Sequence, residues 1–409
     1  MTAQALAAWA RSGAMALTGR PSGPPLASPG HPALVVEQAL ARVGAAALAR
    51  TGTCADLPDV TVLSERAAIA GFTRNAPWSC GGHYRAVRAG DGFIGLSLAR
   101  PADIALVPAL VEADIAGNPW TAVEDWARRT TVAEADERLV LLGLPGGIIP
   151  DKVPVPQREP VRRNTGGHRT WIRERPRIVD FSALWAGPLC SHLLTCSGAE
   201  VIKVESINRP DGARRGPTEF YSLLHGGQYC VAIDFGCATD RSRLARLVAS
   251  ADLVIEASRP RALQRLGLDA EALVGSGVSW LSITARGRQS DRVGFGDDIA
   301  AGAGLYLVDS DGTPLPCGDA IADPLTGVIA AAEASEALLD THARLVDISM
   351  HDVAATAAMR PPEPHSVSRR GENWWVDCAA GTFPVLNPPR RTTTRTAPAH
   401  GAHTLESLL

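Results

Sequence analysis

The chain has 409 residues, of which 45% are hydrophobic and 20% are charged, a balance typical of globular proteins with two or three domains. Its formal net charge of −3 gives no overall attraction to nucleic acid or to an anionic membrane, so neither is expected as a partner. The N-terminus lacks the pattern of a signal peptide, and no apolar run is expected to reach the roughly 18 residues that span a bilayer.

Cysteine and histidine spacing argues against a metal site. The eight cysteines include no CxxC pair, and the ten histidines form no HxxxH or HExxH cluster. Unpaired, reduced thiols are the default for such cysteines, and they suit a cytoplasmic location. We therefore expect a cytoplasmic protein without a bound metal.

The first segment, residues 1–71, shares three blocks with a later part of the chain. The matched blocks are, in order, 12–30 with 302–318, 31–50 with 319–340, and 59–65 with 347–352. In each copy a glycine-rich block precedes an apolar helical run and an acidic, strand-like segment. Ala5 of the first copy stands near the place that Asp297 and Asp298 hold in the second. The pattern predicts a fused duplicate whose first copy is degenerate and lacks the acids.

Residues 151–176 are rich in proline and arginine and show little periodicity, so they are interpreted as a linker. The part from 177 to 360 then alternates short apolar strands with helical segments. Strands are predicted at 177–182, 200–206, 230–235, 252–258 and 279–285, and helices at 187–197, 239–250 and 260–274. This rhythm is typical of an α/β fold with a mostly parallel, Rossmann-like sheet. Residues 361–409 are predicted to form an irregular tail with a terminal helix.

Several motifs of this central part resemble CoA-transferase family III, the CaiB/BaiF-like proteins named after carnitine and bile-acid CoA transferases. Val179-Asp180, Ala186-Gly187-Pro188 and the run 198–205 (GAEVIKVE) resemble the family's opening, in which a strand is followed by AGP, a helix and a second strand. The run 251–267 resembles a later conserved segment, and 283–287 (ITARG) is similar to the family's ITGxG. The segment with the family's catalytic aspartate falls on Gly296-Asp297-Asp298-Ile299.

Residues 72–150 resemble the small α+β domain of the same family, through 82–97 and the closing run that ends at Pro150. That domain normally follows the segment that corresponds to Asp352. The resemblance therefore implies one complete set of family parts in a permuted order, together with the truncated N-terminal duplicate. It also implies a homodimer, with interlocking of the two chains left open.

The resemblance implies an acyl-CoA:carboxylate CoA-transferase, with coenzyme A and acyl-CoA as substrates and no permanently bound cofactor. Asp298 is the implied nucleophile, because a carboxylate can form a mixed anhydride and then an aspartyl-CoA thioester. A helix cap is the alternative role for this aspartate. The implied CoA contacts are Trp185, Ala186, Lys203, Glu205, Arg214, Ala257 and Arg265. Lys203 and Glu205 are otherwise expected as exposed strand residues.

Three other functions stay open. A racemase of the same superfamily would use Asp319 as an acid, although its histidine position holds Asp297. A non-catalytic CoA-binding paralogue is the second alternative, since several family positions differ, among them Trp185 and Ala257. The third is a haloacid-dehalogenase-like phosphatase, because Asp309 begins the string DSDGT. A glycine-containing turn is the preferred interpretation of that string.

Overall fold

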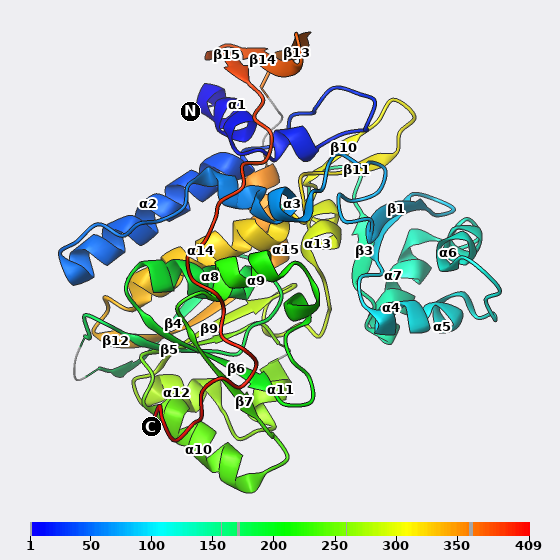
Figure 1. Ribbon diagram of the computed structural model, residues 1–409. Helices are drawn as coiled ribbons and strands as arrows, with labels where there is room; N and C mark the ends of the chain where they lie inside the picture. The colour runs from blue at the N-terminus through cyan, green and yellow to red at the C-terminus, as the bar shows by residue number, and fades with distance from the viewer. Residues whose placement is uncertain (1, 157, 170–171, 259, 360–362) are drawn as a thin grey trace.

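The computed structural model describes residues 2–156, 158–169, 172–258, 260–359 and 363–409, and a seven-stranded sheet lies at its centre (Figure 1). The strand order is β4-β12-β9-β8-β5-β6-β7, and only β4 runs antiparallel to its neighbour. The strands are β4 Val161–His168, β5 Arg177–Asp180, β6 Glu200–Ser206, β7 Tyr229–Ile233, β8 Leu253–Glu256, β9 Ser279–Thr284 and β12 His342–Ser349. The predicted α/β class with a mostly parallel sheet is confirmed, and all five predicted strands are present.

Helices cover both faces of this sheet, which explains why its strands are apolar on both sides. The helices of this part are α8 Ala186–Cys196, η3 Gly212–Arg215, α9 Thr218–His225, α10 Ala238–Ala249, α11 Pro260–Gln264, α12 Ala270–Gly275, α13 Gly296–Gly302, α14 Ala322–Ala337 and α15 Met350–Ala358. One core contains α8 and α14, and a second core on the opposite face contains α10 and α12. A two-stranded hairpin, β10 Tyr306–Val308 and β11 Pro314–Pro316, links α13 to α14.

The helix predicted at 260–274 is interrupted. Its two parts, α11 and α12, are separated by a turn in which Gly267 has a φ of +83°. The left-handed conformation of this glycine ends the first helix. The side chain of Asp269 then accepts a hydrogen bond from the Ala272 N–H at 2.8 Å and starts the second helix.

The segment 151–176, interpreted as a linker, contains a sheet strand. β4 pairs with β12 along the edge of the central sheet, from Val161 opposite Ile348 to His168 opposite His342. The backbone of Gly166 and Gly167 passes so close to α12 that a Cβ atom on Gly167 would lie 2.1 Å from the Gly275 carbonyl oxygen. The strand is therefore fixed by backbone pairing and close approach, which an alternating apolar pattern does not signal.

Residues 1–71 form helices that pack on the central domain (Figure 1). The elements are α1 Thr2–Arg11, η1 Met15–Leu17, α2 Pro32–Thr51, η2 Val60–Leu63 and α3 Glu65–Ala70. α2 packs along α14, its counterpart in the predicted repeat. The strand-like expectation for 59–65 is wrong, because Asp59 accepts the Thr61 N–H and caps a 3-10 helix there. The duplication and the permuted order stay predictions.

The 20-residue helix α2 is long and apolar enough, by length and composition alone, to cross a membrane, contrary to the expectation that no run reaches that length. It is the single such helix in the part of the chain that the structure describes. Of its apolar window, 44% is buried inside the protein. Its packing against α14 and α1 accounts for these apolar residues.

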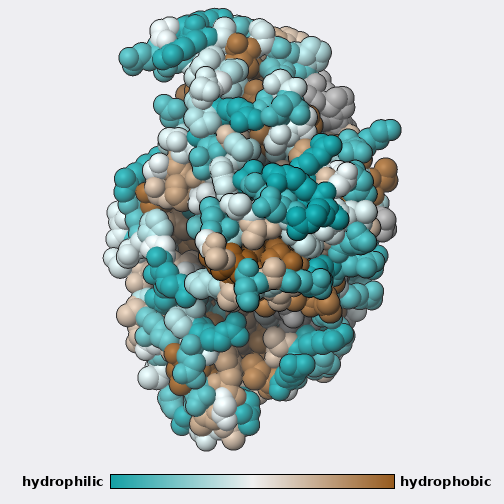
Figure 2. All heavy atoms as spheres, turned by 90° about the vertical axis from the view of Figure 1, so that its right-hand side faces the viewer, coloured by the Kyte–Doolittle hydropathy of each residue, from teal (hydrophilic) through white to brown (hydrophobic). Residues whose placement is uncertain are grey.

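Residues 72–150 form an antiparallel three-stranded sheet with four short helices, beside the central domain (Figure 1). Its elements are β1 Tyr84–Arg88, β2 Phe93–Ser97, α4 Pro101–Ala105, α5 Val107–Val111, α6 Pro119–Ala127, α7 Val132–Leu142 and β3 Gly146–Ile149. Figure 2 shows this side of the molecule, where hydrophilic atoms surround a smaller apolar area. The exposed large apolar side chains of the domain include Ile104, Val140 and Leu141.

The C-terminal residues 363–409 form a small antiparallel sheet and then an extended segment. The strands are β13 His365–Arg370, β14 Asn373–Cys378 and β15 Gly381–Pro384. The predicted terminal helix is wrong, because residues 405–408 form a bend and a turn, with Ser407 bonded back to Thr404. Leu405 and Leu408 are buried in the core beside α10, so hydrophobic burial fixes this end without a helix.

The close approach of β4 to α12 gives a stability test. We expect Gly167→Ala to destabilise the protein by about 1–3 kcal/mol, because the added Cβ must displace backbone atoms. Urea unfolding followed by tryptophan fluorescence measures the change. Gly275→Ala is the matched control, since a Cβ atom there meets nothing within 4 Å. An unchanged midpoint for Gly167→Ala would show that β4 is not packed in this way.

Candidate active site

Asp298 lies near the start of α13 and is only 5% exposed. Its Oδ1 accepts hydrogen bonds from the Ser97 hydroxyl at 2.7 Å and from the Phe295 N–H at 3.0 Å. The second bond satisfies a free N–H at the helix start, so Asp298 does serve as a capping acid. The first bond joins α13 to β2 of the small domain. Asp298 therefore connects two parts of the chain that are about 200 residues apart in sequence.

Asp297 lies in different surroundings from its neighbour. It is partly exposed, and its Oδ1 accepts the Ala320 N–H at 3.0 Å. Burial and the nearby Asp319 raise the pKa of Asp297 to about 7, while Arg66 and the Ala320 N–H act in the opposite direction. Burial also raises the pKa of Asp298 to about 7, against its hydrogen bonds from Ser97 and Phe295. Both carboxyl groups thus change protonation state near neutral pH.

Arg66 of α3 is the cation of this cluster. Its Nε donates to Asp319 Oδ2 at 2.9 Å and its Nη2 donates to the other oxygen of the same carboxylate. Asp319 is completely buried, so this two-bond pairing satisfies a charge that water cannot reach. The Arg66 Cζ atom also lies 4.8 Å from the ring centroid of Trp185. Arg66 therefore joins the acid cluster to the residue that precedes α8.

The small domain closes the cluster on another side. The Cys80 thiol donates to the Gly318 carbonyl at 3.4 Å, and Tyr84 is 2% exposed. Burial, with the charges of Asp297 and Asp298, raises the pKa of the Tyr84 hydroxyl well above its usual value. Sequence reasoning identified the acids and missed Arg66, Cys80, Tyr84 and Ser97. Of these four residues, Ser97 could have been suspected from the sequence, because it ends the run 82–97 that resembles the small domain.

A fourth acid, Asp323, accepts the Gly296 N–H at 3.1 Å, and burial raises its pKa to about 6. Three carboxyl groups of this cluster, Asp297, Asp319 and Asp323, act on the Arg66 guanidinium, and Asp298 acts on Arg286. Because their mutual repulsion and burial disfavour full ionisation, the cluster holds protons at neutral pH. Such carboxyl groups can take up or release a proton near neutral pH.

Three of the predicted CoA contacts lie together at the start of α8. Trp185 is 3% exposed and packs edge-on against Phe220, with ring centroids 5.5 Å apart. Gly327 of α14 lies beneath Ala186, where an added Cβ would come within 2.6 Å of the Ala186 carbonyl oxygen. Ala257, at the end of β8, is exposed on the same side, 3.6 Å from where a Cβ on Gly187 would lie. Of these residues, Ala257 is the one open to solvent.

Lys203 and Glu205 are buried, so the expectation of exposed strand residues is wrong. The Lys203 Nζ lies 2.9 Å from Asp211 Oδ2 and donates to the Ser182 carbonyl at 2.8 Å. Although burial favours the neutral amine, the Asp211 and Asp180 carboxylates raise the pKa of Lys203. Both partners of this ammonium come from loops that follow strands. Lys203 therefore supports the strand ends, and a direct role toward CoA stays a prediction.

Glu205 and Arg214 form a second ion pair at the end of β6. The Arg214 Nη2 lies 2.6 Å from Glu205 Oε2, and the guanidinium stacks on Tyr221 at 4.4 Å. Burial opposes ionisation of Glu205, but the bond from Arg214 holds its pKa at about 2. Arg265, by contrast, is exposed at the end of the α11 segment. Of the predicted cationic contacts, Arg265 is the one whose side chain faces solvent.

The DSDGT string forms the turn between β10 and β11. The Asp309 N–H donates to the Thr313 carbonyl at 2.9 Å, and Gly312 has a φ of +82°. The Asp309 carboxylate forms an ion pair with Arg20. This is the turn geometry that the sequence favoured over a phosphatase nucleophile. Among the residues that the structure describes, no three His, Cys, Asp or Glu side chains lie close enough together to hold a metal ion.

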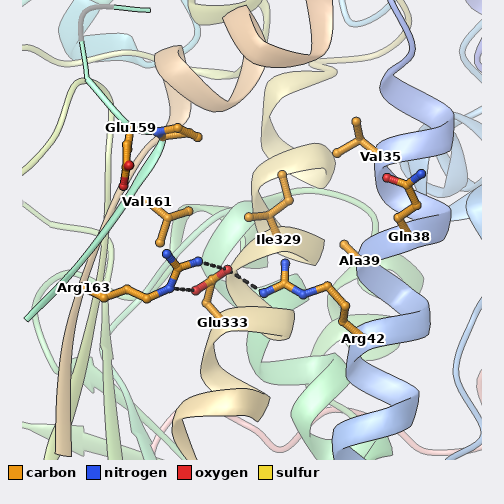
Figure 3. A pocket seen from close by; sticks show the side chains of 10 residues that line it. Val35, Gln38, Ala39, Arg42, Glu159, Val161, Arg163, Ile329 and Glu333 are labelled. Atoms are coloured by element: carbon orange, nitrogen blue, oxygen red, sulfur yellow. Dashed lines mark hydrogen bonds and ion pairs between the residues drawn. The ribbon is translucent and has the colours of Figure 1, made fainter. Parts of the chain in front are cut away.

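A separate pocket of about 340 Å³ lies between α2, β4 and α14 (Figure 3). Its main polar feature is Glu333, 3% exposed, which forms ion pairs with Arg163 at 2.6 Å and Arg42 at 2.7 Å. Figure 3 shows both arginines directed toward this carboxylate. Their charges are satisfied within the protein, and none of the acid-cluster residues lines the pocket. The pocket is therefore distinct from the candidate active site.

Comparisons with known proteins agree with the sequence resemblance. A family model described as CoA-transferase family III matches residues 175–372, a range that contains both adjacent acids. The succinyl-CoA–D-citramalate CoA-transferase of Chloroflexus aurantiacus is 30% identical over 194 residues, 43% of this chain and 48% of that protein. A probable fatty acyl-CoA transferase of Mycobacterium tuberculosis is 32% identical over 202 residues, 44% of this chain and 50% of that protein.

A crystal structure of a hypothetical protein from Mycobacterium tuberculosis aligns at 27% identity with a TM-score of 0.45, covering 50% of this chain and 65% of that one. The chain spans about half the length, or less, of the curated relatives it matches.

The raised pKa of Asp298 predicts a pH-dependent gain in stability for Asp298→Asn. Asparagine keeps an oxygen for both hydrogen bonds and removes the buried charge. Burial raises the pKa of Asp298 from 3.8 to about 7, so ionisation of this carboxyl group destabilises the folded wild-type protein. This loss of stability is absent below about pH 4, grows between pH 4 and pH 7, and is complete above about pH 7. We expect the variant's advantage in unfolding free energy to be larger at pH 8 than at pH 5, by on the order of 2 kcal/mol.

Chemical denaturation of both proteins at pH 5 and pH 8 measures this difference. Glu205→Gln is the control, and its effect on stability should have the opposite sign, because the pKa of Glu205 is lowered to about 2 and its ionised form stabilises the fold. That variant should be less stable than wild type by an amount that stays constant between the two pH values. An equal effect of Asp298→Asn at pH 5 and pH 8 would contradict the burial of its charge.

Proposed function

Because residues 175–372 belong to CoA-transferase family III, we propose that the protein moves coenzyme A between an acyl-CoA thioester and a carboxylic acid. The likeness covers this part of the chain, and the activity of the whole chain is our proposal. Several curated relatives are CoA-transferases, and the two compared above carry succinyl-CoA and fatty acyl-CoA in their names. Dicarboxylic and fatty acyl thioesters are therefore the first donors to test.

One observation carries the proposal. Two adjacent carboxyl groups have pKa values of about 7, and the neighbouring Asp319 is paired with Arg66. The Arg66 guanidinium lies over Trp185 at the start of α8, where CoA contacts are predicted. A carboxylate that is partly removed from water, and still able to ionise at neutral pH, is suited to nucleophilic attack. The contacts of Arg66 with Asp319 and with Trp185 support a site that includes both the acid cluster and the start of α8.

The chemistry that this site would perform is a covalent relay. A carboxylate oxygen attacks the thioester carbonyl carbon, the C–S bond breaks, and CoA leaves as a thiolate from a mixed anhydride. The thiolate attacks the aspartyl carbonyl carbon, which releases the donor acid as a carboxylate and leaves an aspartyl-CoA thioester. The acceptor carboxylate then repeats the exchange in reverse. Division into such steps replaces one difficult transfer by easier ones.

The alternatives receive less support from the site. Racemisation requires a free acid at Asp319, but this side chain is fully buried and paired with Arg66 at both oxygens. The position of the racemase histidine holds Asp297, which removes the imidazole base. A protein that only binds CoA would not need two carboxyl groups that titrate near pH 7. Transfer is therefore the function that the geometry supports best.

Trapping of the covalent intermediate tests the proposed function. We expect succinyl-CoA or a fatty acyl-CoA, followed by hydroxylamine, to leave a hydroxamate on the peptide that contains Asp297 and Asp298. A thioester or anhydride of aspartate reacts with hydroxylamine, whereas a free carboxylate does not. Mass spectrometry of the digested protein detects the product. Protein treated with hydroxylamine alone, or with free CoA, should remain unmodified.

Two other outcomes would decide against transfer. CoA binding without an adduct from any donor would establish a binding role. Exchange of the α-hydrogen of a 2-methylacyl-CoA with solvent deuterium, without transfer, would establish racemisation.

A further inference from the structure

Arg286, in the loop that follows β9, carries a half-buried positive charge. Among the described residues, burial lowers the pKa of four arginines, which are Arg50, Arg74, Arg169 and Arg286. The first three donate to backbone carbonyl groups, which replace the water that they lose. The Arg286 guanidinium has no hydrogen bond or ion pair to any residue that the structure describes. A cation held partly out of water without a partner is costly unless a ligand satisfies it.

The charged groups around Arg286 are occupied elsewhere. Those that act on it through space include Arg292, Asp136, Asp352 and Asp298. Arg292 and Asp136 satisfy each other, because the two terminal nitrogens of Arg292 donate to the two Asp136 oxygens. Asp352 and Asp298 have their own contacts within the fold. The donors of Arg286 are therefore left for a group from outside the chain.

The Arg286 guanidinium lies where α13 meets the small domain. A Cβ atom added to Gly302 of α13 would lie 3.6 Å from Arg286 Nη2 and 3.6 Å from the carbonyl oxygen of Ile148 on β3. The missing side chain at Gly302 thus leaves room for the guanidinium beside the helix. Asp298 and Gly302 are four residues apart in α13, so they share a helical face and lie about 5–6 Å apart. Arg286 is therefore about one helical turn from the implied nucleophile.

The chemistry of this place suits a second carboxylate on the substrate. A guanidinium offers parallel N–H donors that match the two oxygens of a carboxylate. A short dicarboxylic acyl group carries such a carboxylate on two or three methylene groups, about 4–5 Å from its thioester carbonyl carbon. That length is close to one helical turn of about 5.4 Å. A saturated acyl chain would instead cover the guanidinium of Arg286 without giving it a partner.

We propose that Arg286 makes the protein select a dicarboxylic substrate, by binding the carboxylate at the far end of the acyl chain. The inference rests on the proposed function, and it chooses the dicarboxylic class over the fatty acyl class. Arg286 touches the end of the substrate that does not react, so no bond to it forms or breaks. It is a specificity-determining residue, and the same contact serves a dicarboxylic acid that acts as the acceptor.

Two donors that differ only at this end test the proposal. Succinyl-CoA ends in a carboxylate where butyryl-CoA ends in a methyl group. We expect Arg286→Gln to lower kcat/KM for succinyl-CoA roughly 10- to 100-fold, because a charge-assisted hydrogen-bonded pair is lost. The value for butyryl-CoA should stay within about threefold of wild type. Arg286→Lys keeps the charge without the planar fork, so it should recover part of the preference.

Position 302 allows a test that leaves Arg286 in place. Gly302→Asp puts a carboxylate beside the guanidinium, so it should reduce the preference for succinyl-CoA as Arg286→Gln does. Gly302→Ala is the matched control, since its Cβ meets neighbouring atoms only at ordinary contact distance. That variant should keep the wild-type ratio of the two kcat/KM values. Circular dichroism and thermal unfolding confirm that each variant is folded.

Binding of unreactive CoA thioethers measures the contact without the chemistry. S-(3-carboxypropyl)-CoA has the chain length of the succinyl thioester, and S-butyl-CoA lacks its carboxylate. In calorimetric titrations, wild type should bind the first at least about tenfold more tightly, and Arg286→Gln should bind the two alike. Arg292→Gln is the control for a general effect of positive charge, because Arg292 is already paired with Asp136. It should leave the ratio of the two affinities unchanged.

Equal losses of affinity for both thioethers in Arg286→Gln would overturn the proposal and assign Arg286 to a phosphate of CoA, which both probes share. A ratio that Arg286→Gln leaves unchanged, or that Arg292→Gln lowers to the same extent, would also overturn it. Absence of transfer from every donor by the wild-type protein would instead reject the proposed function. Because the thioether titrations need no transfer, the two failures are distinguishable.

Discussion

Burial of several carboxyl groups around a single guanidinium is the constraint on which the candidate site depends. Asp319 has no access to water and is satisfied by Arg66, whereas Asp297, Asp298 and Asp323 rely on N–H and hydroxyl donors. These donors come from the N-terminal region, the small domain and the central domain. Since an unpaired buried charge costs several kcal/mol, the three parts must be docked before the acids can coexist. The site and the domain arrangement therefore stabilise each other.

The central sheet was predictable because its strands carry continuous apolar runs between helical segments. β5, β6, β7, β8 and β9 follow from this pattern alone. β4 did not, since its sequence is polar and glycine-rich and its place is fixed by backbone pairing with β12. The 3-10 turn at Val60–Leu63 was missed for a related reason: one side-chain cap at Asp59 outweighs a strand-like composition.

The candidate site was predictable only in part. The acids of α13 stand in a motif, so a sequence comparison selects them. It could not show that Asp297 and Asp298 have different surroundings, because these depend on what each side chain meets after folding. Arg66 and Ser97 come from positions more than 200 residues away from the acids they contact. For Lys203 the expected exposure was wrong, because the fold buries its ammonium in an ion pair with Asp211.

The two edges of the central sheet are formed differently, and in each case a segment outside the family match, 175–372, takes part. At one side β4 adds an antiparallel strand whose exposed residues include Arg162 and Arg163. At the other, the C-terminal segment returns to β7, where the His403 N–H donates to the Cys230 carbonyl at 2.9 Å. Unpaired sheet edges are the usual starting points for strand addition between molecules. The chain thus pairs part of one edge and places exposed arginines on the other, two arrangements that disfavour strand addition by another molecule.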